Sequence, residues 1–202
     1  MKTSQLDVIT YGEAMTMFVA NETGELDQAM QFTKRIAGAE LNVSIGLSRL
    51  GMNVGWVSRV GDDSFGHFTL ATLEQEGIDH QCVIVDQRFP TGFQLKSKAE
   101  NGTDPKVEYF RKGSAASHLS VHDFDRTYFS QARHLHLSGV AAALSTDSLE
   151  LANHAAKEMR AMGKTISFDP NLRPVLWPSQ QVMCEKLNAL AFQADWVLPG
   201  LK

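Results

Sequence analysis

Apolar residues along the chain alternate between short continuous runs and longer stretches with helical spacing. Short runs of about four to eight apolar residues are typical of buried strands, and apolar residues every three or four positions are typical of amphipathic helices. The pattern predicts strands over residues 7–11, 53–60, 82–85, 133–139, 165–169 and 196–198. It predicts helices over residues 41–50, 65–76, 147–162 and 178–193. Alternation of this kind predicts the α/β class, with a doubly wound, mostly parallel sheet and helical crossovers.

Residues that favour the ends of helices support the predicted bounds of these helices. Glycines follow the first three predicted helices, at Gly51, Gly77 and Gly163, where a left-handed residue commonly ends a helix. Asp62 and Asp63 precede the second helix and supply the carboxylate that a helix N-cap prefers. Pro178 is predicted to lie in the first turn of the last helix, where proline is tolerated.

Two segments, 13–36 and 91–112, break the alternation. Each contains two strand-like pieces, over 14–20 and 30–36 and over 92–98 and 106–112. The first pair surrounds a turn-rich stretch at 21–24, and the second surrounds Asn101-Gly102, which is a strong hairpin signal. These four strands predict a small antiparallel sheet at the carboxyl ends of the main strands, where ligands bind in such folds. A sheet there would act as a lid that excludes water.

The composition is that of a soluble globular protein. The 202 residues are 43% hydrophobic and 21% charged, and the formal net charge of −4 argues against nucleic acid or an anionic membrane as the main partner. The longest stretch without a charged residue, 134–146, is shorter than the about 20 residues of a membrane-spanning helix. The N-terminal residues lack the pattern of a signal peptide, so a cytoplasmic location is expected. Cys82 and Cys184 are expected to be buried free thiols in a reducing compartment.

Several nucleotide and nucleophile motifs do not occur. The sequence has no GxxxxGK[ST], no GxGxxG after the first strand and no GxSxG. The most informative stretch is 37–44, where Gly38 and Ala39 precede Glu40 and Asn42. Glycine allows close approach of a ligand to the backbone, and a helix start there would suit a polyhydroxylated or anionic molecule. A glycine that simply starts a helix fits the pattern equally well.

Two further stretches carry candidate binding residues. Tyr109 and Arg111 share one face of a predicted lid strand and could grip a carboxylate, although a solvated strand face with an Arg at its rim has the same pattern. Asn171 and Arg173 follow a predicted strand, at the sheet edge where active-site residues gather. His134 and His136 share a strand face but have no further metal ligand at suitable spacing, which favours a structural role.

Taken together, these motifs resemble those of the ribokinase-like (PfkB) family of sugar kinases. The resemblance covers essentially the whole chain and rests on Gly38 to Ser44, Leu50-Gly51 and Val60 to Asp63 with Phe65-Gly66. The Gly-Ala-Glu-x-Asn stretch at 38–42, the run 109–115 and the run 169–173 followed by Leu176-Trp177 are similar to the 2-dehydro-3-deoxygluconokinase branch.

The resemblance implies phosphorylation of 2-dehydro-3-deoxy-D-gluconate by ATP with Mg²⁺. It implies a substrate site that adjoins the nucleotide site, with Asn171 and Arg173 at the junction of the two. The implied substrate-binding residues are Gly38, Ala39, Glu40, Asn42, Gln94, Tyr109, Arg111 and Arg173. Gln94 departs from the family pattern, because some members carry tyrosine at this position. A homodimer through the lid is also expected.

The family's second signature, a Gly-Ala-Gly-Asp turn with the catalytic Asp, does not occur in the sequence. We therefore expect residues 1–202 to be a single incomplete kinase domain, with lid strands within 13–36 and 91–112. The resemblance places the catalytic base and most of the ATP site beyond Lys202. Two alternatives remain open: a kinase for a neutral sugar, such as a fructokinase or ribokinase relative, and a catalytically inactive sugar-binding module.

Overall fold

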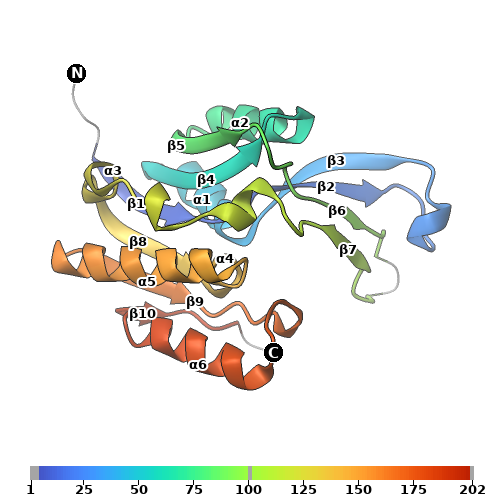
Figure 1. The fold of residues 1–202 in the computed structure, drawn as a ribbon. Helices are drawn as coiled ribbons and strands as arrows, with labels where there is room; N and C mark the ends of the chain where they lie inside the picture. The colour runs from blue at the N-terminus through green and yellow to red at the C-terminus, as the bar shows by residue number, and fades with distance from the viewer. Residues whose placement is uncertain (1–4, 100–101, 201–202) are drawn as a thin grey trace.

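A six-stranded parallel sheet forms the centre of the computed structural model, which describes residues 5–99 and 102–200 (Figure 1). The strands lie in the order β10-β9-β8-β1-β4-β5, and every neighbouring pair is parallel. Their bounds are β1 (Leu6–Tyr11), β4 (Val54–Gly61), β5 (Asp79–Asp86), β8 (Ala132–Ser138), β9 (Thr165–Asp169) and β10 (Trp196–Val197). The chain order reverses at β1, because the sheet grows first towards β5 and later towards β10. The predicted doubly wound sheet is confirmed.

Helices cover the sheet on both faces. The longer ones are α1 (Ala39–Arg49), α2 (Ser64–Gln75), α5 (Thr146–Ala161) and α6 (Gln180–Ala191). Short helical turns fill the connections: η1 (Leu26–Gln28), η2 (Ala115–His118), η3 (Val121–Asp123), α3 (Arg126–Ser130), α4 (Gly139–Ala142) and η4 (Pro174–Leu176). Right-handed crossovers in opposite directions put α1 and α2 on one face and α5 and α6 on the other.

Two buried clusters correspond to these two faces. Leu41 of α1 and Leu73 of α2 pack with Trp56 of β4, whereas Leu151 of α5 packs with Leu135 of β8. Successive side chains of a strand point to opposite faces, which explains how a single sheet contributes to both clusters. None of the helices within the described residues combines the length and apolar character needed to cross a membrane.

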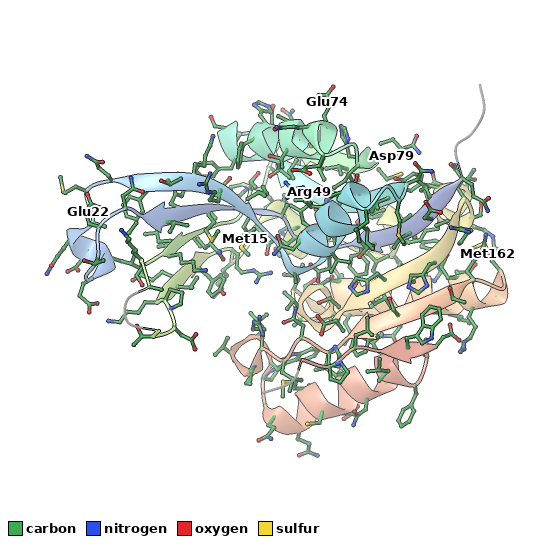
Figure 2. The ribbon with its side chains drawn as sticks, turned by 180° about the vertical axis from the view of Figure 1, so that it is seen from behind. Met15, Glu22, Arg49, Glu74, Asp79 and Met162 are labelled. Atoms are coloured by element: carbon green, nitrogen blue, oxygen red, sulfur yellow. The ribbon has the colours of Figure 1, made fainter. Side chains whose placement is uncertain are left out.

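The lid is a separate four-stranded sheet that projects from the carboxyl edge of the main sheet (Figure 1). It contains β2 (Met15–Ala20), β3 (Phe32–Ala37), β6 (Phe93–Lys96) and β7 (Val107–Phe110), in the order β3-β2-β6-β7. In Figure 2, Met15 lies at the root of the lid and Glu22 at its far end.

The expectation of an antiparallel lid is wrong in one respect, because β2 and β6 pair in parallel. Each begins one of the two excursions, and both leave the same edge of the main sheet in the same direction. Only the pairs β2–β3 and β6–β7 are antiparallel. The predicted Asn101-Gly102 turn includes Asn101, which lies outside the described residues.

Two smaller expectations also need correction. Pro178 precedes the last helix instead of lying in its first turn, because Ser179 is the N-cap and its side chain accepts the N–H of Val182 at 3.2 Å. Cys184 is exposed, and Cys82 is partly buried. Both cysteines are free thiols, as expected.

Asp63 joins the start of α2 to the root of the lid. Its Oδ1 accepts the N–H groups of Phe65 at 3.0 Å and Gly66 at 2.8 Å, which confirms the predicted N-cap. Its Oδ2 accepts the N–H of Thr91 at 2.8 Å, just before β6. One carboxylate thus satisfies helix and loop donors together.

We predict that Asp63→Ala lowers the free energy of unfolding by about 1–3 kcal/mol, since it leaves the helix and loop N–H groups without their acceptor. The neighbouring Asp62 is a matched control, because it is exposed and its carboxylate contacts the side chains of His67 and Gln87 instead of helix N–H groups. Asp62→Ala should change stability by less than about 0.5 kcal/mol. Urea unfolding of both variants measures the difference, and equal effects would contradict this role of Asp63.

Candidate functional site

A cleft of about 780 Å³ lies between the lid and the carboxyl edge of the main sheet. It brings together residues from several separate parts of the chain, including nearly all of the site residues that the sequence predicts. The predicted residues on its walls are Gly38, Ala39, Asn42, Gln94, Tyr109, Arg111, Asn171 and Arg173. The strand directions explain this convergence, because parallel strands end at the same edge.

The lid wall of the cleft is a row of side chains across three strands. Met17 pairs with Gln94, and Gln94 pairs with Tyr109, so the three lie side by side on one lid face. Lys96 lies two residues after Gln94 and also lines the cleft. Sequence reasoning did not select Lys96, although period two along the predicted strand would have placed it on the face of Gln94.

The opposite face of the lid is aromatic. Phe18, Phe93 and Phe110 contact one another or Phe65 of α2, with ring centroids 4.6–6.4 Å apart. These contacts anchor the lid on the main domain. They leave the polar face of β6 and β7 directed at the cleft.

Gly38 forms the floor of the cleft at the start of α1. Its backbone has φ 153° and ψ 130°, and a Cβ there would lie 2.6 Å from the backbone oxygen of Glu13. Only glycine fits this position without strain. Its carbonyl accepts the N–H of Asn42 at 2.9 Å, and the Asn42 side chain is exposed at the cleft wall.

The wall opposite the lid follows β9. Asn171 has φ +37°, in the left-handed region, and its N–H donates to Asp169 Oδ1 at 2.9 Å. Asparagine tolerates this conformation better than most residues. Arg173 is exposed and donates from Nη1 to the backbone oxygen of Leu172 at 2.8 Å, which leaves the rest of its guanidinium at the cleft.

Glu40 does not line the cleft, contrary to the expectation from the sequence. Glu40 is only 1% exposed, and its Oε1 accepts a hydrogen bond from the N–H of Ala141 at 3.1 Å. A Cβ at position 12 would lie 2.5 Å from Glu40 Oε2, so Gly12 provides the space for the carboxylate. Glu40 therefore joins α1 to the ends of β1 and β8 beneath the site. Burial raises the pKa of its carboxyl to about 7.

Glu13 is a buried residue beside the cleft that the sequence did not indicate. Its Oε2 lies 2.5 Å from Arg111 Nη2, and its Oε1 accepts the Ser114 hydroxyl at 2.5 Å. Burial raises the pKa of Glu13, while the Arg111 charge and the hydrogen bond from Ser114 oppose that shift. Its partners lie about a hundred positions away in sequence, so no local motif could have identified it.

The charges on the cleft walls all have one sign. Lys96, Arg111 and Arg173 line the cleft, whereas no Asp or Glu within the described residues does so. This local excess of cations contrasts with the net charge of −4 for the chain. The cleft therefore favours an anionic ligand, and its amide and hydroxyl groups suit one that also carries hydroxyls.

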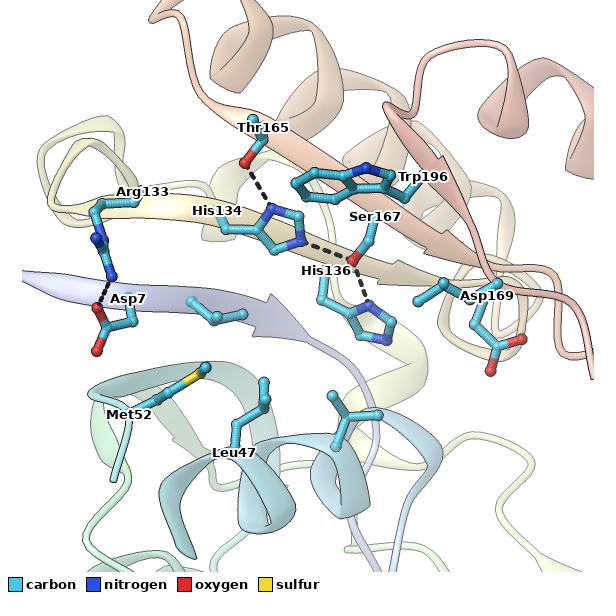
Figure 3. Close-up of a pocket in the computed structure, with 13 residues that line it drawn as sticks. Asp7, Leu47, Met52, Arg133, His134, His136, Thr165, Ser167, Asp169 and Trp196 are labelled. Atoms are coloured by element: carbon cyan, nitrogen blue, oxygen red, sulfur yellow. Dashed lines mark hydrogen bonds and ion pairs between the residues drawn. The ribbon is translucent and has the colours of Figure 1, made fainter. Parts of the chain in front are cut away.

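A second cavity, of about 590 Å³, lies on the sheet face opposite α5 (Figure 3). His134 contacts the hydroxyls of Thr165 at 2.8 Å and Ser167 at 2.7 Å, and His136 contacts Ser167 at 2.9 Å. Burial lowers the pKa of His136 to about 4, so it is neutral at pH 7. Within residues 5–99 and 102–200 no group of three His, Cys, Asp or Glu side chains could hold a metal. Both histidines are held by strand hydroxyls, and their structural role stays a prediction.

The chain is similar in sequence to carbohydrate kinases. The model of the "pfkB family carbohydrate kinase" matches residues 5–202. A 2-dehydro-3-deoxygluconokinase of Bacillus subtilis (strain 168) is 50% identical over 198 residues, which are 98% of this chain and 61% of that protein. The chain thus spans about three fifths of the length of this curated relative.

Solved structures share its fold. A PfkB protein from Polaromonas sp. JS666 is 53% identical, with a TM-score of 0.94 over 96% of this chain and 66% of that one. A sugar kinase from Pyrococcus horikoshii, solved in complex with ATP, is 27% identical, with a TM-score of 0.86 over 94% of this chain and 62% of that one.

The raised pKa of Glu40 predicts a pH dependence of stability. The folded state holds the carboxyl proton up to a pH of about 7, whereas the unfolded chain releases it near the ordinary value of 4.5. Stability contributed by this proton is complete below pH 4.5 and is lost as the pH rises through 7. Glu40→Gln removes the titration and keeps the acceptor for Ala141, so the variant should gain stability relative to the unmodified protein between pH 5 and about 7.5.

Thermal melts across this pH range measure the difference between variant and unmodified protein. The control is Glu74→Gln, which changes an exposed glutamate on α2. Its effect on stability should be small, because the side chain is exposed. A difference for Glu40→Gln that stays constant with pH would contradict the titration of Glu40.

Proposed function

The chain belongs to the pfkB family of carbohydrate kinases, and on this premise we propose that the protein phosphorylates 2-dehydro-3-deoxy-D-gluconate with ATP. One observation carries the choice of a sugar acid: the cleft walls bear Lys96, Arg111 and Arg173 without a lining carboxylate. Arg111 is already paired with Glu13 behind the wall, but Lys96 and Arg173 have no carboxylate partner among the described lining residues, and a neutral sugar would supply none. The name of the relative that is 50% identical agrees with this substrate.

Each wall of the cleft suits one part of such a substrate. Arg111 and Tyr109 on the lid suit the carboxylate, because a guanidinium can form paired hydrogen bonds to it. The side-chain amides of Asn42 and Gln94 suit the hydroxyl groups, and the backbone at Gly38 allows close contact. The lid above them excludes water, which would otherwise compete as phosphoryl acceptor.

The phosphoryl donor belongs at the β9 side of the cleft. Arg173 lies at the carboxyl end of this strand, where its charge can neutralise the transferring phosphoryl group. Asn171 beside it suits the junction of sugar and nucleotide. The solved relative in complex with ATP supports this donor. The described residues form no cluster of three His, Cys, Asp or Glu side chains that could hold a metal.

None of the described residues that line the cleft is Asp, Glu or His, the side chains best suited to act as a general base at neutral pH. We therefore predict that a polypeptide of residues 1–202 does not transfer phosphate, because no carboxylate or imidazole among these lining residues can accept the proton of the attacking hydroxyl. A coupled assay of ADP release with 2-dehydro-3-deoxygluconate tests this, with circular dichroism to verify folding. Turnover equal to that of the protein at its full natural length would contradict the prediction.

In the protein at its full natural length, Arg111→Ala should raise KM for the sugar acid about 10- to 150-fold, the value of one charge-assisted hydrogen bond of ~1.5–3 kcal/mol. KM for ATP should change much less, because Arg111 lies on the lid. Arg173→Ala should lower kcat as well, since it removes the positive charge that would stabilise the transferring phosphoryl group. Steady-state kinetics with both substrates measure these values.

An unchanged sugar-acid KM in Arg111→Ala would make the carboxylate role of Arg111 wrong. Faster turnover of D-fructose than of the sugar acid by the unmodified protein would favour a neutral-sugar kinase instead.

A further inference from the structure

Glu13 lies behind the lid wall of the cleft, at the junction of the two sheets. It follows Gly12 at the end of β1, and its side chain is 1% exposed. A buried carboxylate is costly unless it is paired, and Glu13 has two partners, Arg111 at 2.5 Å and Ser114 at 2.5 Å. One carboxylate therefore joins the main sheet to the segment that follows lid strand β7.

The surroundings of Glu13 are shaped to hold it. A Cβ at Gly92 would lie 2.7 Å from Glu13 Oε1 and 3.3 Å from the Cβ of Arg111, so only glycine leaves room for the pair. The N–H of Ser114 donates to the backbone oxygen of Arg111 at 3.0 Å, through a turn in which Gly113 has φ +72°. Because of this turn, Arg111 and Ser114 both contact the carboxylate of Glu13.

Arg111 has Glu13 on one side and the cleft on the other. Its side chain is 13% exposed and lines the cleft, with the guanidinium carbon 6.0 Å from the centre of the Tyr109 ring. Arg111 Nη2 and Glu13 Oε2 form an ion pair at 2.5 Å. Charge thus fixes the guanidinium, while its planar set of five N–H donors is not saturated by Glu13.

We propose that Glu13 is a positioning residue that gives the cleft its affinity for a sugar acid by holding Arg111 in place; this inference rests on the proposed function. Glu13 does not contact the substrate. It orders the long Arg111 side chain before binding, which lowers the entropy lost when a substrate carboxylate is bound. The same contact couples the lid to the end of β1.

The test uses steady-state kinetics of the protein at its full natural length, with 2-dehydro-3-deoxygluconate and ATP. Glu13→Gln keeps the shape and the acceptor for Ser114 but removes the charge that holds Arg111. KM for the sugar acid should rise about 5- to 10-fold, with kcat and KM for ATP changed less than about twofold. The control is Glu108→Gln, which alters an exposed glutamate on β7 and should change none of these values.

A double-mutant cycle separates positioning from a merely structural role. If Glu13 acts through Arg111, adding Glu13→Gln to Arg111→Ala should raise KM by less than about twofold further. The proposal would be overturned if Glu13→Gln raised the sugar-acid KM 5- to 10-fold in the Arg111→Ala variant as well. Equal changes in kcat and in both KM values would also overturn it. A lower KM in Glu13→Gln would also overturn it, because Glu13 would then compete with the substrate for Arg111.

Ser114→Ala supports the test if Glu13→Gln does not fold, as judged by thermal melts. It removes one partner of Glu13 and should raise the sugar-acid KM about 2- to 5-fold; no change would then overturn the proposal. Failure of the proposed function is distinguishable, since unmodified protein that does not phosphorylate the sugar acid would reject both. Normal turnover by unmodified protein with an unaltered KM in Glu13→Gln rejects the positioning role alone.

Discussion

Six parallel strands end at one edge of the main sheet, and the position of every cleft residue depends on this constraint. Gly12 and Glu13 follow β1, Val140 follows β8, and Asn171 follows β9. The two lid excursions leave from the same edge, so the lid can lie only above it. Loops that leave this edge are where ligands bind in α/β folds.

Two buried carboxylates beneath the cleft link the sheet edge to the binding surface. Glu13 contacts Arg111, and the charge of Arg111 also stabilises ionised Glu40. Removing one partner of a buried ion pair usually costs more than the pair contributes, because the remaining charge has no compensation. Arg111 is therefore a part of the folded core as well as of the cleft wall, so its position is defined before any ligand arrives.

The two faces of the sheet differ in character at β8. Leu135 and Leu137 pack into the cluster formed with α5, while His134 and His136 face the second cavity. The histidines are held by hydroxyls of β9, and burial lowers the pKa of both. The second cavity is lined by Asp7, Arg133 and Asp169, whereas the charged residues that line the cleft are all cations.

The sequence by itself determined the features that depend on neighbours within a few residues. Apolar periodicity predicted the succession of strands and helices along the chain, Asp62 and Asp63 were recognised as candidates for the N-cap filled by Asp63, and period two placed Tyr109 and Arg111 on one face of a lid strand. Of the nine substrate-binding or nucleotide-binding residues that the motif resemblance predicted, all except Glu40 line the cleft. Local hydrogen bonds and side-chain alternation are properties of short segments, so they can be predicted without a fold.

Only the tertiary structure decided which of these groups are buried and which meet. Glu40 lies within the predicted motif but is enclosed by Gly12 and Ala141, and the parallel pairing of β2 with β6 depends on how two distant excursions leave the sheet. Glu13 meets its partner, Arg111, across 98 positions. Burial and long-range charge pairing depend on the packing of the whole chain, and no short segment contains that information.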